Sequence, residues 1–298
     1  MGKVLRIFGR IATSPFRALS SMFGSTRELL FEQPDDTPLL GVIEKTFAQP
    51  SDLLEHVVDL RKRLLWAVLG LAVTTGISFT FAPQIIDLLA GPIGGMNELV
   101  AIDVTEPISV FMRVSLLSGF ALALPWIAFQ IWLFAAPGLM LRTRWSTLYS
   151  IPLVVLFFLG GMFFSYKVLL PTALPYLLSF MGITTIPRPA SYISFVTSLL
   201  FWVGIAFEFP FVIFILARLG FVKGTTLAKQ WRLAFVIIAI AAAAITPTVD
   251  PVNMSLLMGP LLVLYALSVL LAFLAQGARK NEERKKEQAA QREQQEAR

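Results

Sequence analysis

Residues 201–214 read FWVGIAFEFPFVIF and hold one carboxylate, Glu208, within a longer apolar run, Phe195–Ala217. The longer run can cross a hydrocarbon core of about 30 Å as a helix. A charged side chain near the bilayer centre costs roughly 2.5–3.5 kcal/mol on insertion scales, so Glu208 predicts a functional position. Pro210 lacks an N–H and its ring clashes with the carbonyl of Ala206, so we expect the helix to bend beside this acid.

The composition of the whole chain is that of a membrane protein. Of its 298 residues 56% are hydrophobic and 15% are charged, whereas soluble domains have about 25% charged residues. The chain has no cysteine and one histidine, His56, which excludes disulfides, thiol catalysis and multi-histidine metal sites. It also lacks the HExxH, Gly-rich phosphate-loop and nucleophile-elbow motifs. We therefore expect no enzyme activity, cofactor or metal.

Six apolar segments predict an all-α integral membrane protein with six transmembrane helices. The segments are Leu64–Ala82, Val114–Ala136, Ser146–Leu170, Phe195–Ala217, Trp231–Thr246 and Met254–Ala275. The fifth would reach only ~24 Å, which indicates local thinning of the bilayer or shielding by neighbouring protein. Prolines within the spans, at positions 125, 152, 210 and 260, favour a kinked, cup-shaped bundle.

The positions of the basic residues predict the orientation of the chain. Of the 25 Lys and Arg residues, all except Arg113, Lys167 and Arg188 lie in the two ends or in, or directly beside, the second-to-third and fourth-to-fifth connections. By the positive-inside rule both termini are therefore cytoplasmic. We expect the protein to be integral to the cytoplasmic (inner) membrane.

We expect three parts in the chain: an N-terminal extension over 1–50, a membrane domain over 51–275, and a charged cytoplasmic tail over 276–298. Residues 1–24 have four basic residues, no acid and apolar residues at helical spacing. This pattern is typical of an amphipathic helix on a membrane surface, although a transit peptide has a similar composition. The tail is either a solvated helix or a disordered extension.

The segment Ser51–Leu65, just before the first span, has an apolar stripe at helical spacing, with Glu55, Asp59 and Arg63 together on another face. It is either an amphipathic lead-in helix or, through Glu55 and Asp59, an acidic site for a basic ligand. The residues alone also fit a proton-coupled small-molecule secondary transporter built around Glu208. That alternative is weakened because no second copy of the Glu208 segment is present.

Several short segments, taken in order, resemble the TatC family, the multi-span receptor of twin-arginine protein translocation. They are LEHVVDLRKRL (54–64), IDVTEP (102–107), QIWLFAAPGL (130–139), SYISF (191–195), AFEFP (206–210) and TPTVDP (246–251). The resemblance extends over roughly Leu53–Ala275. It implies a receptor for the twin-arginine signal peptides of folded cargo, which recruits TatA-type and TatB-type single-span subunits in the lipid bilayer. It also implies that several copies of the chain assemble in the complex and that the proton-motive force drives transport. No binding of nucleic acid is implied.

The resemblance also assigns roles to individual positions. The signal-peptide-binding face would include Asp59, Arg61, Arg63 and Phe134, together with Glu55 and the position of Thr143. Pro92, Tyr166, Pro210 and Asp250 match positions with structural roles or in external loops.

The chain departs from the family pattern at Thr143, where relatives usually have a glutamate in the first cytoplasmic loop. Threonine offers only a neutral acceptor to a guanidinium, and Arg142 and Arg144 would repel one. Either Glu55 and Asp59 carry more of the recognition, or twin arginines are bound weakly or with different partners.

Glu208 matches the intramembrane acid of the family. Two roles are open for it: it docks a polar side chain of a partner's single span, or it carries a proton. We favour docking.

Overall fold

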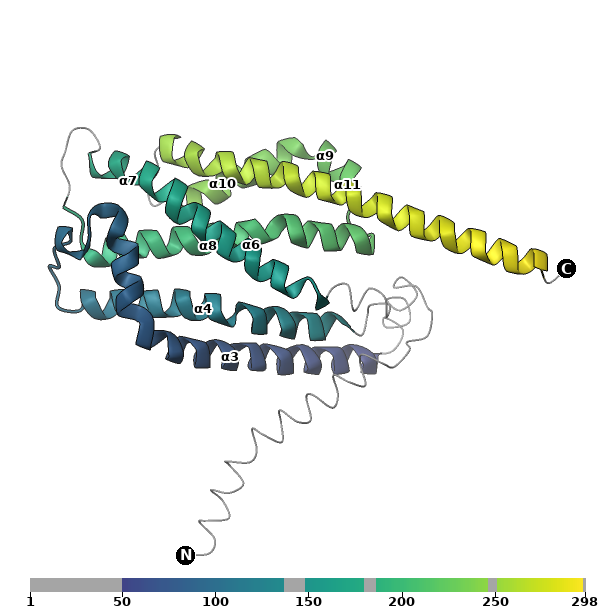
Figure 1. The fold of residues 1–298 in the computed structure, drawn as a ribbon, viewed down its shortest axis with the longest axis horizontal. Coiled ribbons are helices and arrows are strands. Elements are labelled where there is room, and N and C mark those ends of the chain that lie inside the picture. The colour runs from purple at the N-terminus through teal and green to yellow at the C-terminus, as the bar shows by residue number, and fades with distance from the viewer. Residues whose placement is uncertain (1–49, 137–147, 180–185, 246–250, 297–298) are drawn as a thin grey trace, which may run out of the picture. The chain divides into compact units, whose positions relative to one another are not determined.

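The computed structural model describes residues 50–136, 148–179, 186–245 and 251–296, and within these ranges the chain is helical with no strand (Figure 1). The predictions for the N-terminal extension, Thr143 and Asp250 fall outside the described residues.

The long helices are α3 (Pro50–Ala90), α4 (Glu106–Ala135), α6 (Ile151–Phe164), α8 (Pro189–Leu219) and α11 (Pro251–Glu296). Shorter ones are α7 (Leu170–Leu178), α9 (Gly224–Lys229) and α10 (Trp231–Ile245). A π-helical turn, Ser165–Leu169, joins α6 to α7, so that one apolar helix runs over Ile151–Leu178.

Five helices of the described chain are long and apolar enough to cross a membrane, and α10 is a sixth, shorter apolar helix. The prediction of an all-α membrane protein is confirmed, and α10 is short as expected. The spans are longer than predicted at several ends. The lead-in segment and the first span form one continuous helix, α3, and the second span begins at Glu106 instead of Val114.

The ends of α8 and α11 follow from local sequence. Pro189 occupies the first turn of α8, where a missing N–H costs nothing, and Gly220 ends this helix with a left-handed φ of 90°. Helix α11 continues beyond its apolar part, Met254–Gly277, as far as Glu296. The charged tail is therefore a helix, the yellow end of the chain in Figure 1.

The contacts divide the chain into two compact units. The first unit comprises residues up to Val73 and Ala123–Leu153, and the second comprises Thr74–Leu122 and everything from Val154 onward. In the first unit, the indole N–H of Trp126 in α4 donates to the carbonyl of Trp66 in α3 (2.9 Å). Gly70 lies against the ring of Trp126, so that a Cβ at this position would clash with it.

The second unit contains the main apolar core, in which α8 is central. Ile193, Val196 and Val203 of α8 are almost completely buried, and α8 packs most extensively against α11. Helix α6 approaches α8 closely, because Gly161 faces Gly204 with no side chain between the two backbones. Small residues at such crossings are typical of helix packing in membranes.

Candidate functional site

The N-terminal part of α3 presents the charged residues that the sequence singled out. Asp59 and Arg61 are exposed, and Arg63 is half-buried. The Nε atom of Arg63 is buried without a hydrogen-bond partner in the described part of the chain. Glu55 belongs to the same helix, one turn before Asp59. This face can therefore offer both a carboxylate and guanidinium groups to a polar ligand.

The hydrogen bond between α3 and α4 puts Phe134 at about the level of Asp59 along the two helices. The two helices are antiparallel, and the Trp126–Trp66 hydrogen bond fixes their register. Asp59 is seven residues before Trp66, and Leu133 is seven residues after Trp126, so Asp59 lies level with Leu133 and Phe134. Phe134 is half-buried beside a small cluster of buried side chains, Trp132, Leu133 and Ala136. The structure thus brings these two predicted positions to one level of the first unit.

Glu208 belongs to the second unit, in α8, where it is half-buried. It follows Gly204 by four residues, and so lies on the face of α8 that α6 approaches. Its Oε1 atom is buried and has no hydrogen-bond partner among the described residues. An unpaired buried oxygen of this kind costs free energy until a donor reaches it. Pro210, two residues later, is buried within the same helix.

Tyrosine hydroxyls hold the C-terminal end of α3. Tyr166 donates to the carbonyl of Leu88 and Tyr192 to that of Leu89, each at 2.7 Å. These carbonyls belong to the last turn of a helix, where no N–H of the helix itself reaches them. Pro92 lies in the 3-10 turn that follows, Gly91–Ile93. Tyr166 and Pro92 are thus parts of one capped helix end.

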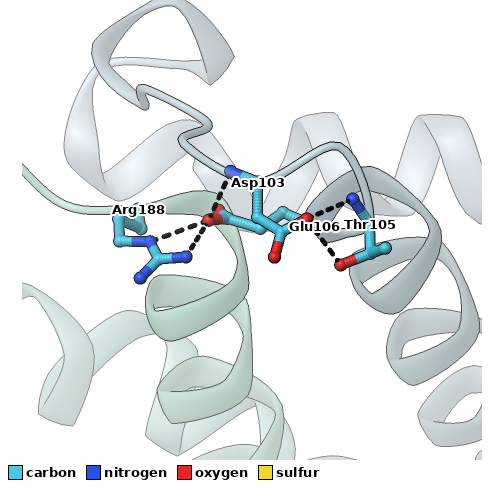
Figure 2. Close-up of polar contacts among 4 residues, drawn as sticks. All are labelled: Asp103, Thr105, Glu106 and Arg188. Atoms are coloured by element: carbon cyan, nitrogen blue, oxygen red, sulfur yellow. Dashed lines mark hydrogen bonds and ion pairs between the residues drawn. The ribbon is translucent and has the colours of Figure 1, made fainter.

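An ion pair that the sequence did not reveal joins the N-terminal ends of α4 and α8 (Figure 2). Glu106 is 3% exposed, and its Oε1 atom accepts from Nε of Arg188 (2.7 Å), from Nη2 of Arg188 and from the backbone N–H of Asp103 (3.3 Å). Helix α4 starts at Glu106, so a second acid besides Glu208 lies within a helix of spanning length. The sequence shows an acid directly before Pro107, but it does not indicate that Arg188, 82 residues later, is the partner of this acid.

The loop before α4 is ordered around Asp103. Thr105 donates to Oδ1 of Asp103 from both its backbone N–H and its hydroxyl, each at 2.9 Å. These two hydrogen bonds hold the pKa of Asp103 below its usual value, because they favour the ionised carboxylate. The turn that they stabilise also presents the Asp103 backbone N–H to Glu106 (Figure 2).

We expect Arg188→Leu to lower the Tm of the purified protein by roughly 5 °C in a detergent melting experiment. The substitution leaves the carboxylate of Glu106 buried without its cation, which is the costly way to break such a pair. Asp103→Asn is the control, because it removes the charge of an exposed acid beside the pair and keeps an Oδ1 acceptor for Thr105; we expect the Tm to change by no more than about 1 °C. The double variant Glu106→Gln/Arg188→Leu should melt above Arg188→Leu. A double variant that melts lower still would contradict this account of the pair.

Residues 55–260 match the family model described as Sec-independent protein translocase protein (TatC). A Sec-independent protein translocase protein TatC of Deinococcus radiodurans is 38% identical over 251 residues, which are 80% of this chain and 91% of the relative. That of Aquifex aeolicus is 34% identical over 233 residues, with 75% of this chain and 95% of the relative covered.

Two solved structures are also similar. One, described as the twin arginine translocase receptor TatC, superposes with a TM-score of 0.66 at 33% sequence identity. The match covers 74% of this chain and 99% of the chain in that structure. The other, described as the same receptor in DDM, gives a TM-score of 0.67 at 32% sequence identity. Here the match covers 73% of this chain and 99% of the chain in that structure.

Proposed function

The chain belongs to the TatC family of Sec-independent protein translocase proteins, and from this premise we propose that it is the receptor subunit of a twin-arginine translocase. In this role it binds the signal peptides of folded proteins and recruits single-span TatA-type and TatB-type subunits. The proton-motive force drives export, and this subunit hydrolyses no nucleotide. The observation that carries the proposal is the match to the solved receptor structure, almost all of which has a counterpart here.

The protein is integral to the membrane, and we propose that it lies in the inner membrane with both termini cytoplasmic. The support is the charge distribution, since only three of the 25 basic residues lie outside the proposed cytoplasmic segments. In this orientation Asp59 and Phe134 face the cytoplasm, where a signal peptide arrives. The Glu106–Arg188 pair and the tyrosine-capped end of α3 then lie on the external side.

The proposed signal-peptide-binding face consists of Glu55, Asp59, Arg61, Arg63 and Phe134. A pair of arginines is best held by carboxylates, through bidentate charge-assisted hydrogen bonds. Asp59 is exposed and level with Phe134, so it can bind a guanidinium while the aromatic ring contacts the apolar part of the peptide. Because Thr143 offers no charge, we assign the recognition of the paired arginines to Asp59 and Glu55.

We propose that Glu208 docks the single span of a partner subunit. The support is its Oε1 atom, which is buried and unpaired among the described residues, while the side chain as a whole is half-exposed. A polar side chain on the partner helix would supply the missing hydrogen bond. Assembly of several copies of this chain in the complex belongs to the same proposal. The alternative function, a small-molecule transporter, has no support among the relatives. Both relatives named above are translocase proteins.

A photo-cross-linker placed at Phe134, which leaves the carboxylates of Asp59 and Glu55 in place, is expected to capture a synthetic twin-arginine signal peptide. The same peptide with both arginines changed to lysine should give a yield at least about tenfold lower, because lysine cannot form the bidentate bonds. Yields are read by gel after irradiation of membranes that contain the full chain.

The control places the cross-linker at Val104, which is 91% exposed in the loop before α4 and external in the proposed orientation. Capture at Val104 with the yield seen at Phe134 would rule out this binding face. Equal capture of the arginine and lysine peptides at Phe134 would rule out recognition of the paired arginines by this face.

A further inference from the structure

Arg113 is a charged residue within a membrane-spanning helix, and the proposed function gives it no role. It lies on α4 seven residues after Glu106, about 10 Å further along the helix axis. Its side chain is exposed on the surface of the second unit. A guanidinium at such a depth requires a polar or anionic partner, because the surrounding hydrocarbon provides none.

Within the described chain Arg113 makes one side-chain hydrogen bond and no ion pair. Nη1 of Arg113 donates to Oγ of Ser194 in α8 at 2.8 Å. No carboxylate pairs with Arg113 in the described chain, where the acid nearest to the start of α4, Glu106, is bound to Arg188. A guanidinium has five N–H donors, so most of those on Arg113 remain available to a ligand.

The packing of α4 and α8 holds this guanidinium in place. The helices run in the same direction, and the Glu106–Arg188 pair and the Arg113–Ser194 hydrogen bond lie in register along their contact. Ser194 accepts a hydrogen bond from Arg113, and its own O–H can donate to a further acceptor. Arg113 and Ser194 together therefore offer several donors at one point of the protein surface.

The surface around this point is apolar. Met112 and Leu116 of α4, the residue before Arg113 and the residue one turn after it, are both more than half exposed. A ligand that suits the whole surface combines an anionic group with hydrocarbon, as a phospholipid does. Arginine binds phosphate through its planar fork, and its long stem can reach toward the headgroup region from within the apolar layer.

We propose that Arg113 and Ser194 form a binding site for the phosphate of a phospholipid, in the leaflet that the N-terminal ends of α4 and α8 enter. The acyl chains of this lipid lie along Met112 and Leu116. The proposal does not depend on signal-peptide recognition. In the orientation proposed above, this is the external leaflet.

The test is native mass spectrometry of the delipidated full chain in detergent, titrated with dioleoylphosphatidylglycerol. Arg113→Gln is expected to weaken the tightest lipid-binding step roughly tenfold, the effect of losing a charged hydrogen-bonding group. Arg113→Lys should restore part of the affinity, and Ser194→Ala should lose a smaller part. The matched control is Lys167→Gln, which removes one exposed basic residue whose amine lies 5.4 Å from the ring of Tyr166, and should bind as the unchanged protein does.

Two further titrations identify the source of the phosphate. Dioleoylglycerol, which has the same chains and no phosphate, should not occupy the site, and inorganic phosphate at millimolar concentration should not displace the phospholipid. Displacement by inorganic phosphate would overturn the proposal in favour of a site for free anions.

The proposal is also wrong if Arg113→Gln binds the phospholipid as tightly as the unchanged protein, or if Lys167→Gln weakens binding equally. A Tm measured for each variant shows whether it is folded. If Arg113→Gln does not fold, the comparison of Ser194→Ala with Lys167→Gln decides the question, and equal affinities in those two variants overturn the site. A photo-cross-linker at Met112 that captures a single-span subunit and no lipid would also overturn it.

Discussion

Glu208→Leu is expected to weaken docking of the partner's single span by about ten- to a hundredfold and to reduce export of a folded twin-arginine cargo accordingly. The loss is large because leucine removes the acceptor and leaves the partner's polar side chain unpaired in the membrane. Glu208→Gln is expected to retain most of the export, because glutamine keeps an oxygen acceptor at the same position. Both are measured with a folded fluorescent cargo in cells that lack their own receptor, together with cross-linking to the partner subunit.

Ser268→Ala is the matched control for this prediction. Ser268 is also a buried polar residue of a membrane helix, but its hydroxyl already donates to the carbonyl of Leu264 at 2.7 Å. Its removal should leave docking and export unchanged. If Glu208→Gln stopped export while cross-linking to the partner persisted, docking would be the wrong role and a proton carrier the better one. Normal export by Glu208→Leu would exclude both roles.

Gly161→Leu is expected to lower the free energy of unfolding by about 3 kcal/mol, the upper end of the usual cost of overpacking. A Cβ at this position would lie 2.9 Å from the Cα atom of Gly204 and 3.0 Å from the Cβ atom of Phe207. The first of these atoms is backbone and cannot turn away, so α6 would have to move off α8. The change is read as a lower Tm in detergent.

Gly160, the adjacent residue, provides the control. A Cβ there would meet nothing within 4 Å, and the residue is exposed. Gly160→Leu should therefore leave the Tm unchanged or raise it slightly, since leucine favours the helix by up to about 1 kcal/mol over glycine. If Gly160→Leu and Gly161→Leu lowered the Tm equally, the close approach of Gly161 to Gly204 would not be the cause of the loss of stability.

Much of the fold was predictable because the membrane imposes a length and a polarity on each helix. The run around Glu208, for example, could only be a buried or spanning helix, and α8 does extend through it from Pro189 to Leu219. The helix ends were less predictable. The predicted second span begins at Val114, after Glu106 and Arg113, yet both charged residues lie within α4 and contact α8 or the residue before it.

The candidate site was partly predictable for a similar reason. Glu208 stands out in the sequence through its cost in a bilayer, and Asp59 through its position on an amphipathic helix. The sequence alone could not show that Asp59 lies level with Phe134, because this depends on the register in which Trp126 binds the carbonyl of Trp66. It also could not show that Oε1 of Glu208 is buried without a partner.

By itself, the sequence determined that this protein is a helical membrane protein, which segments are its spans, and that one acid lies deep within them. Only the tertiary structure decided that Glu106 pairs with Arg188, that Tyr166 and Tyr192 cap α3, and that Gly161, unlike Gly160, meets another backbone. The reason is physical: helices that are apolar on every face, such as α6 and α8, carry no pattern that marks the packed face. Rotation and register are set when the helices meet.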